Sequence, residues 1–271
     1  MFRLSREVRF AVNSVADDAR AAGKSPANAY AGFPSINGLA HYFTLAVTVA
    51  GELDRDSSYL LNIKDIDQQV RRLAIPLIND VVRTRPGAFG HGTLVELFGV
   101  LKDAWSPARV EEIRLALSPL TSIAALAKEF PMTRLSQKFE FSASHRLHNP
   151  ALSDDVNRRT YGKCNNPHGH GHNYEVQVTL AGTPAGESGL LVDVPAFERT
   201  VAETVIERMD HKNLNVEVPE FRDLIPSVEN IARVIYRMLK PKLEAGQARL
   251  AGVTVWETPK TWCEYSEGED D

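Results

Sequence analysis

The chain has 271 residues, of which 43% are hydrophobic and 24% charged, and its formal net charge is −4. This length is sufficient for two domains that each bury a core. The basic residues are scattered rather than gathered into one stripe, so nucleic acid is not an expected partner. No apolar run approaches the ~20 residues that span a bilayer, and the N-terminus lacks the pattern of a signal peptide. We therefore expect a cytoplasmic protein without a membrane partner.

The sequence repeats itself at a constant spacing. The motif Arg-Leu-Ser at residues 3–5 recurs 131 positions later at residues 134–136, and residues 45–51 correspond to residues 176–182 at the same spacing. A later pair, Ser118-Pro119 and Thr258-Pro259, has a spacing of 140, which implies nine inserted residues in the second copy. Chance matches would not keep one register for so long.

Two homologous domains are the interpretation of this repeat. We predict the first over residues 1–126 and the second over residues 135–271, joined by a linker at residues 127–134. Alternating apolar residues predict strands near residues 8–10 and 45–51 in the first copy. The second copy ends in an acidic tail, which is predicted to be solvated.

The second copy shows the order of elements most clearly. Residues 135–145 and 172–181 alternate with period two and predict antiparallel strands, separated by a long polar connection. Asp193 can cap the helix that follows, with Pro195 in its first turn. This helix carries an apolar stripe at spacing four, formed by Phe197, Val201, Val205 and Met209.

A second helix and two strands complete the copy. The helix is predicted to start at Ser227 and to end before Pro241, because proline disrupts a helix interior. Strands follow at residues 249–256 and 261–265, with a turn at residues 258–260. Each copy thus has the order β-β-α-α-β-β, an antiparallel sheet with helices on one side, and the fold class is α+β.

Three histidines of the second copy can converge if its first two strands pair. His170 and His172 share one strand face because side chains alternate, and His145 lies on the other strand. Three imidazoles are typical of a zinc site that leaves one coordination position open. The alternative is a solvated histidine-rich loop, which would be preferred for an isolated His-x-His pair, but His145 and the nearby Cys164 favour the site. His168 is assigned to the loop or to a supporting role.

Cys164 stands six residues before His170. Close to a divalent metal and to Lys163, its thiolate form would be favoured, which suits a base or a nucleophile. The alternative is a small buried hydrophobe. Cys263 lies far away in an aromatic strand and takes that second interpretation, so no disulfide is expected.

Two further positions carry groups suited to proton transfer or binding. Asp210 and His211 follow the first helix, where a histidine coupled to a carboxylate can relay a proton. The alternative is a histidine that only interacts with the helix dipole. Glu257 ends a strand and can present two acceptor oxygens to adjacent N–H donors of a ligand. Its alternative is an exposed acid at a strand end.

Four motifs of the second copy stand in a fixed order: Phe-Ser-Ala-Ser-His at 141–145, Gly-Lys-Cys-Asn-Asn-Pro with His-Gly-His-Asn-Tyr within 162–174, Asp-His-Lys-Asn-Leu at 210–214 and Val-Trp-Glu-Thr at 255–258. Together they closely resemble the 6-pyruvoyltetrahydropterin synthase family, which includes the 6-carboxytetrahydropterin synthases of queuosine biosynthesis. The resemblance implies the tunnelling fold, in which sheets from several domains close into barrels. It also implies zinc (Zn2+) held by His145, His170 and His172, and a pterin ring anchored by Glu257.

The reaction implied by the resemblance starts from 7,8-dihydroneopterin triphosphate. Zinc would bind the side-chain hydroxyls and make neighbouring protons easier to remove. Cys164 would be the proton acceptor, with Asp210 and His211 as partners in proton transfer. Elimination of triphosphate with internal redox gives the pyruvoyl product, whereas loss of two carbons gives the carboxy product. The Asn-Asn-Pro insertion after Cys164 looks more like the pyruvoyl enzymes but does not settle the product. The nearby basic residues Arg158, Arg159 and Lys163 are candidates for holding the triphosphate.

The first copy departs from this pattern at nearly every position. Only His41 matches a ligand, since the other equivalents are Ser14 for His145, Leu39 for His170, Phe33 for Cys164, residues 79–80 for the Asp-His pair and Leu117 for Glu257. We therefore predict a non-catalytic first domain that covers sheet edges, and one active site per chain. A homo-oligomer of three such chains would contain six domains, the number in the family's usual hexamer.

Two other functions stay open from the sequence. The chain could be a zinc-dependent hydrolase on the same scaffold, in which case the three histidines are needed but Cys164 and Glu257 are not. It could also be a pterin-binding or assembly protein without turnover, although the complete set of groups in the second copy argues against this.

Overall fold

The computed structural model describes residues 1–14, 32–86, 89–184, 189–244 and 248–268. Within these ranges no helix has the length and apolar character needed to cross a membrane. Contacts divide the chain into two compact units. Unit 1 consists of Met1–Leu135 and Gly182–Leu191, and unit 2 consists of Ser136–Ala181 and Val192–Asp271.

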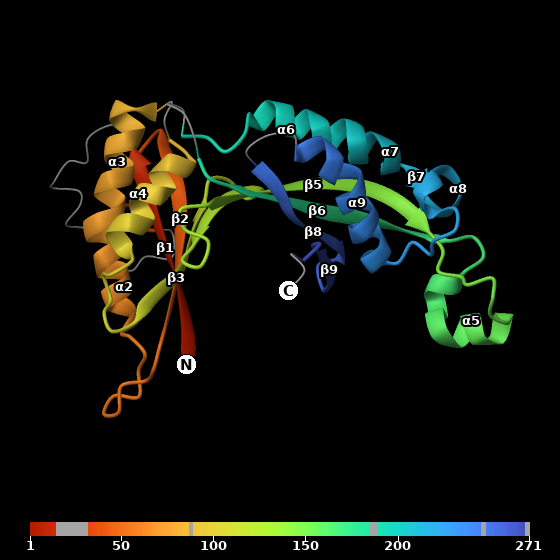
Figure 1. The fold of residues 1–271 in the computed structure, drawn as a ribbon, viewed down its shortest axis with the longest axis horizontal. Helices are drawn as coiled ribbons and strands as arrows, with labels where there is room; N and C mark the ends of the chain where they lie inside the picture. The colour runs from red at the N-terminus through yellow and green to blue at the C-terminus, as the bar shows by residue number, and fades with distance from the viewer. Residues whose placement is uncertain (15–31, 87–88, 185–188, 245–247, 269–271) are drawn as a thin grey trace. The chain divides into compact units, whose positions relative to one another are not determined.

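Unit 1 pairs an antiparallel sheet with a layer of helices. Its strands lie in the order β1 (Phe2–Asn13), β2 (Ala40–Gly51), β3 (Arg109–Ala116) and β4 (Thr121–Leu126). A long helical segment and a second helix follow β2: α2 (Ile63–Gln69), the π-helical η1 (Val70–Ala74), α3 (Ile75–Thr84) and α4 (His91–Leu101). The helices stand on one face of the sheet (Figure 1). Alternate residues of β2, such as Leu45, Val47 and Val49, are fully buried beneath them.

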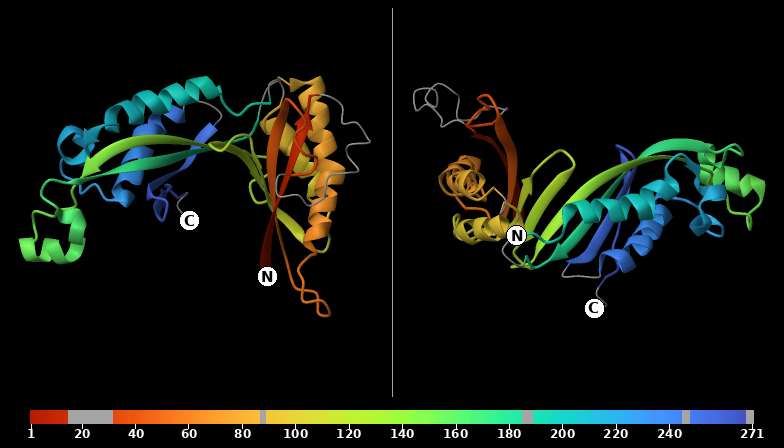
Figure 2. Two further views of the ribbon diagram at one scale, coloured as in Figure 1. Left: turned by 180° about the vertical axis from the view of Figure 1, so that it is seen from behind. Right: turned by 90° about the horizontal axis from the view of Figure 1, so that it is seen from above.

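Unit 2 has the same kind of architecture. Its strands are neighbours in the order β5 (Thr133–His145), β6 (His170–Gly182), β8 (Ala248–Thr258) and β9 (Thr261–Tyr265), and the short β7 (Lys212–Asn213) pairs parallel to β5. The covering helices are α6 (Val194–Val201), the π-helical η4 (Ala202–Ile206), α7 (Glu207–Met209) and α9 (Val228–Leu243). The α9 helix packs on β8 and β9 and beside α6, on the same side of the strands (Figure 2).

Short elements of unit 2 lie at the end where β5 stops and β6 starts. They are α5 (Asp154–Tyr161), the 3-10 turn η3 (Gly162–Asn165), α8 (Leu214–Glu217) and the 3-10 turn η5 (Pro219–Phe221). The predicted polar connection between the first two strands therefore contains a helix. Ser153 caps α5, and Asp154 and Asp155 occupy its first turn, which satisfies and complements the free N–H groups there. The helix lacks an apolar stripe, and for this reason periodicity did not reveal it.

The predicted helix caps are confirmed. The side chains of Asp193 and Ser227 accept hydrogen bonds from backbone N–H groups in the first turns of α6 and α9. The apolar stripe is also confirmed, since its members are at most 3% exposed: Phe197, Val201, Val205 and Met209.

Two predicted boundaries are wrong. The α9 helix does not end before Pro241 but continues to Leu243. Pro241 is exposed in the last turn, and the N–H of Glu244 still bonds to the carbonyl of Lys240. The backbone N–H that Pro241 lacks therefore does not end the helix. Residues 133 and 134, assigned to the linker, already belong to β5.

Equivalent contacts occur in both units at the spacing of the sequence repeat. The hydroxyls of Ser5 and Thr48 lie 2.8 Å apart, and those of Ser136 and Thr179 lie 3.0 Å apart. The Arg6–Asp67 ion pair corresponds to a hydrogen bond from Gln137 to Glu198, and the Phe10–Phe43 ring contact corresponds to Phe141–Tyr174. Each unit also has a π-helical segment in its first long helix, at Val70–Ala74 and Ala202–Ile206.

Candidate metal and proton-transfer site

The three predicted histidines lie at the end of the buried face of unit 2. Along β6 the even-numbered residues from Tyr174 to Leu180 are at most 1% exposed, and His170 and His172 continue that face. Along β5, Phe141 and Ala143 are buried and His145 is fully buried. Strand alternation thus carries all three imidazoles to one side of the sheet, as the sequence predicted.

The imidazoles of His145, His170 and His172 form a group that could hold a metal ion. Their ligand nitrogens all lie within 4.8 Å of one another, and this is the one such group of His, Cys, Asp or Glu in the described part of the chain. The Nε2 atoms of His145 and His170 are 3.1 Å apart. Histidine is a common ligand of zinc, and three nitrogens leave a position open.

Hydrogen bonding prepares these rings for a cation. Nδ1 of His145 lies 2.7 Å from the carbonyl oxygen of Pro226, which can only accept, so this nitrogen carries the proton and Nε2 presents a lone pair. Buried nitrogens of the other two rings, Nδ1 of His170 and Nε2 of His172, have no hydrogen-bond partner. Nε2 of His172 faces the cluster, since it approaches the same Glu257 oxygen as Nε2 of His145, and an unsatisfied buried nitrogen there fits a bound metal ion.

Burial favours the neutral form of His145 and His170, which is the form that binds a metal. Desolvation, with a smaller contribution from the neighbouring imidazoles, lowers the pKa of His145 to about 4 against the opposing effect of the Pro226 carbonyl. Desolvation also lowers the pKa of His170, together with the charge of His172. Neutral imidazoles are therefore available as ligands at physiological pH.

Glu257 belongs to the same cluster. One carboxylate oxygen, Oε1, lies 3.4 Å from Nε2 of His145 and 3.6 Å from Nε2 of His172. Its side chain is 19% exposed and stands near the end of β8, beyond the buried residues Val253 and Val255. The position suits a carboxylate that favours a nearby cation and still reaches a ligand in the site.

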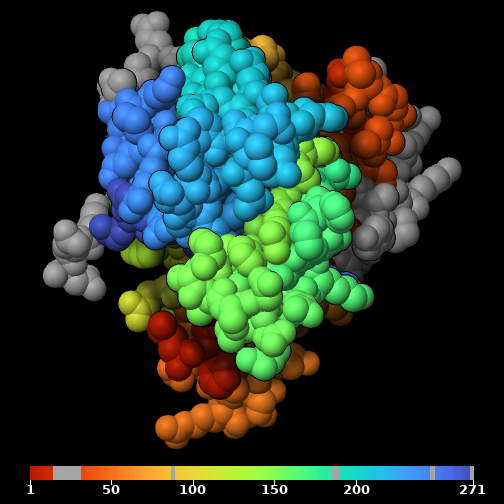
Figure 3. Space-filling model, turned by 90° about the vertical axis from the view of Figure 1, so that its right-hand side faces the viewer, coloured from red at the N-terminus to blue at the C-terminus, as the bar shows by residue number. Residues whose placement is uncertain are grey.

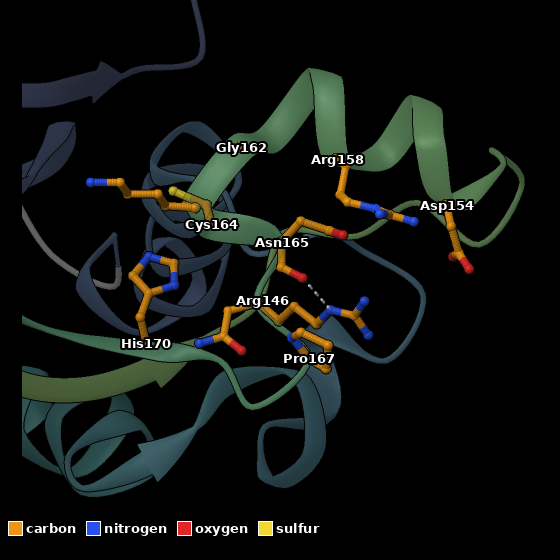
Figure 4. A pocket seen from close by; sticks show the side chains of 10 residues that line it. Arg146, Asp154, Arg158, Gly162, Cys164, Asn165, Pro167 and His170 are labelled. Atoms are coloured by element: carbon orange, nitrogen blue, oxygen red, sulfur yellow. Dashed lines mark hydrogen bonds between the residues drawn. The ribbon is translucent and has the colours of Figure 1, made fainter.

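Cys164 lies in the turn that follows α5 and faces the same region. Its carbonyl accepts a hydrogen bond from the N–H of Leu147 (2.9 Å), and the neighbouring Asn165 donates from its amide to the carbonyl of Leu147 (2.8 Å). These bonds fix the turn against the segment after β5. The half-buried thiol and His170 line a common pocket of about 910 Å³ (Figure 4).

Asp210 and His211 form a hydrogen-bonded pair directly after the continuous helical segment of α6, η4 and α7, called the long helix of unit 2 below. Nδ1 of His211 lies 2.7 Å from Oδ2 of Asp210, while Oδ1 accepts from the N–H of Ser142 (2.8 Å). The Ser142 N–H and the His211 side chain both lower the pKa of Asp210, which stays ionised. His211 has a left-handed backbone, with φ 57°, and its own N–H bonds to the Ser142 carbonyl. Such strain is typical of positions that surrounding bonds hold in place.

The structure does not bring every predicted group into one pocket. His170 and Cys164 line the 910 Å³ pocket, whereas His172 and His211 line a second pocket of about 530 Å³. The imidazole of His211 is 83% exposed. Within the described residues of unit 2, the metal-binding group therefore stands between two hollows, one with the thiol and one with the Asp-His pair.

Gly169 is required by the close approach of this loop to β5. Its φ is +74°, and a Cβ atom there would lie 3.0 Å from the carbonyl oxygen of His145. A side chain at this position would meet that oxygen and adopt a disfavoured backbone. The exposed His168 precedes it in the loop and is not part of the metal-binding group.

Sequence reasoning missed groups that support the site without belonging to its motifs. Asn215 bonds through its side chain to both backbone groups of Arg146, and the Pro226 carbonyl orients His145. Nothing in the local pattern predicts these contacts because the partners are about 70 to 80 positions apart. Arg146, which lines the thiol pocket, is adjacent to a ligand and basic, and this signal could have found it.

Three histidines that could hold a metal ion, at the end of an antiparallel sheet covered by helices, indicate the class of protein. Residues 134–268 match the family model of 6-pyruvoyl tetrahydropterin synthase. The 6-pyruvoyl tetrahydrobiopterin synthase of Homo sapiens is 41% identical over 125 residues, which cover 46% of this chain and 85% of the human protein. The chain belongs to the 6-pyruvoyl tetrahydropterin synthase family.

Two further comparisons concern a related enzyme and a solved structure. The 6-carboxy-5,6,7,8-tetrahydropterin synthase of Haemophilus influenzae is 26% identical, over 50% of this chain and 100% of that protein. The structure of Caenorhabditis elegans 6-pyruvoyl tetrahydropterin synthase is 35% identical and covers 52% of this chain and 99% of that chain, with a TM-score of 0.49. The matched part of the chain contains all seven predicted site residues.

Proposed function

We propose that unit 2 is a zinc-dependent lyase that converts 7,8-dihydroneopterin triphosphate to 6-pyruvoyltetrahydropterin. The observation that carries this proposal is the convergence of three imidazoles beside Glu257, one of them with a buried Nε2 atom that has no hydrogen-bond partner. The 41% identity to the human pyruvoyl synthase, against 26% to a carboxy synthase, supports the pyruvoyl product.

The chain's own groups have defined tasks in this proposal. Zinc held by His145, His170 and His172 would supply Lewis-acid polarisation of the substrate's side-chain hydroxyls, which acidifies the neighbouring C–H groups. Cys164, which shares a pocket with His170, would accept a proton from such a carbon.

The Asp210–His211 pair would act in the second proton transfer. The hydrogen bond to Asp210 engages Nδ1 and leaves Nε2 of His211 as the nitrogen available to a substrate. This imidazole lines a different pocket from the thiol. In the proposal, the His211 that acts together with a given Cys164 would therefore come from a neighbouring chain of a homo-oligomer.

Glu257 would anchor the pterin ring. A carboxylate can accept two parallel hydrogen bonds from the ring N–H and the adjacent amino group, which fixes the orientation of the ring. Its position 3.4 Å from His145 would hold the ring's side chain next to the metal-binding group.

We also propose that unit 1 is a non-catalytic copy of the synthase domain. The matching element order, the equivalent Ser–Thr contacts and the two π-helical segments support a common origin. At the ligand positions, Ser14 and Leu39 are exposed and carry no imidazole, and no metal-binding group occurs among the described residues of unit 1.

Incubation of zinc-loaded protein with 7,8-dihydroneopterin triphosphate tests the enzymatic proposal. We expect release of triphosphate and formation of 6-pyruvoyltetrahydropterin, identified by mass spectrometry. Cys164→Ala should lower kcat by about a hundredfold or more, in the range for loss of a general base. Cys263→Ala, which removes the other thiol, should leave the rate unchanged.

Other outcomes identify the competing functions. A 6-carboxy product would assign the chain to the second branch of the family. Hydrolysis that survives both Cys164→Ala and Glu257→Ala would indicate a zinc hydrolase. The absence of triphosphate release from the unmutated protein would contradict the synthase proposal.

A further inference from the structure

The pocket that contains the candidate thiol is strongly cationic. It has a volume of about 910 Å³, and three of its lining residues are basic: Arg146, Arg158 and Lys163. The only acidic side chain in its lining is Asp154. A pocket of this size accommodates a small-molecule ligand, and its charge selects an anion.

The basic groups are largely uncompensated. The guanidinium of Arg146 bonds to the Asn165 carbonyl (3.2 Å) and approaches Nδ1 of His148 (3.3 Å), and neither partner is a carboxylate. Lys163 has no ion pair or hydrogen bond from its side chain within the described residues. Arg158 pairs with Asp155 at 3.4 Å, but with side chains 70% and 79% exposed this contact is weak.

The pocket has two chemically different ends. Figure 4 shows the thiol of Cys164 and the ring of His170 on one side, and the guanidinium groups of Arg146 and Arg158 on the other. Arg146 is held by its bond to the η3 turn, and Arg158 projects from α5. An elongated ligand with one reactive end and one anionic end matches this arrangement.

The position of α5 leaves this pocket accessible. The segment that contains α5 and η3 lies at the surface of unit 2 (Figure 3). Consecutive helical residues project about 100° apart, so Arg158 and Arg159 point in different directions. Only Arg158 lines the pocket, although both are exposed on the same turn.

We propose that Arg146 and Arg158, with Lys163, form the subsite that binds the polyphosphate of the substrate. The inference rests on the proposed function for the identity of that substrate, but the anion-binding subsite can be tested without turnover. Guanidinium groups donate in a fixed fork that matches phosphate oxygens, and Lys163 adds a point charge. The subsite would hold the anionic end while the hydroxyl-bearing carbons lie at Cys164 and His170.

The test compares two charge reversals on the same helix. Arg158→Glu and Arg159→Glu change the net charge of the chain equally, so long-range electrostatics are matched. Isothermal titration of zinc-loaded protein with inorganic tripolyphosphate should show at least a tenfold higher Kd for Arg158→Glu and less than a twofold change for Arg159→Glu. With the triphosphate substrate, Arg158→Glu should raise KM by a similar factor and change kcat little.

The outcomes of these measurements either support or overturn the proposed polyphosphate subsite. Equal affinity of Arg158→Glu and the unmutated protein for tripolyphosphate, an equal loss in both variants, or no binding at all would overturn the subsite. A selective loss in Arg158→Glu with no turnover of the pterin substrate would keep the subsite and reject the proposed function. Turnover of the pterin substrate with an unaltered KM in Arg158→Glu would keep the proposed function and reject the subsite. ATP serves as a polyphosphate on a different base, and selective weakening of ATP and tripolyphosphate alike would support recognition of the phosphates themselves.

Discussion

His168 and His170 lie two positions apart on one loop but differ in their surroundings. His168 is exposed, whereas His170 has its Nε2 atom 3.1 Å from that of His145 and a buried Nδ1 atom. We expect one zinc ion per chain in the unmutated protein, less than 0.1 in His170→Ala, and one in His168→Ala. Loss of one ligand of three removes most of the affinity of such a site. Plasma emission spectrometry of purified, dialysed proteins measures these contents.

The matched pair excludes a general effect of histidine removal. If His168→Ala lost zinc as completely as His170→Ala, the ligand assignment would be wrong. Two zinc ions per unmutated chain would show a second site and contradict the proposed loss of ligands in unit 1. Far-UV circular dichroism of each variant checks that the sheet is intact.

At the scale of single residues, strand parity carried much of the prediction. His145, His170 and His172 were assigned to one site because alternate residues share a face, and the structure places them together. The groups that orient them were not predictable. Pro226 acts through its backbone carbonyl, which every residue possesses, and only its place in the fold makes it a partner.

The elements of unit 2 show where periodicity works and where it fails. The long helix and α9 were found because apolar residues recur along a buried face. The α5 helix was missed because it packs few apolar residues and is defined by its Ser153 cap and its first-turn acids. That missed helix carries Arg158, a triphosphate candidate from the sequence, and only the structure showed that Arg158 and Arg146 line the pocket while Arg159 does not.

The start of α4 in unit 1 contains a buried histidine that sequence reasoning did not single out. His91 is 2% exposed, and its Nδ1 atom accepts the N–H of Leu191 at 3.2 Å. Burial lowers the pKa of His91 to about 4. Below pH 6.5 the imidazole of His91 binds a proton in the unfolded chain, whereas in the folded chain it stays neutral down to about pH 4. The free energy of unfolding therefore falls as the pH drops through this interval.

A pH series of urea unfolding measures this effect. Between pH 7 and pH 5, His91 should remove about 2 kcal/mol of unfolding free energy from unit 1. His91→Asn can accept the same N–H but does not titrate, so its stability should decline by about that much less over the same interval. All other titrating groups are common to the two proteins. Parallel pH profiles for the two proteins would show that His91 is protonated equally in the folded and unfolded states.

At the scale of the whole molecule, the end strands require cover. β1 and β9 stand at the ends of the strand order and each has one neighbouring strand in the described residues. β1 is 12 residues long and carries the half-exposed Phe2 at its start. Long unpaired edges pair with other chains or are covered by them. We therefore expect a homo-oligomer, with three chains of 30.0 kDa as the first assignment.

Light scattering coupled to size-exclusion chromatography measures the assembly directly. A mass of three chains agrees with six sheet-bearing units around closed barrels. The mass of a single chain at micromolar concentration would contradict the proposed assembly. Leu4→Pro in β1 should weaken an assembly that uses this edge, because proline cannot donate a backbone hydrogen bond. Arg3→Lys, which preserves the charge of an exposed residue of the same strand, serves as the control.

The sequence by itself determined the order of the main strands and covering helices in unit 2, the face of each strand and the convergence of His145, His170 and His172. These follow from local rules, because side-chain alternation and helix periodicity depend on neighbours in the chain. Only the tertiary structure decided which groups share a pocket. Cys164 and Arg158 meet across one hollow while His211 faces another, because these distances depend on how β5, α5 and the long helix pack. No local pattern contains that information.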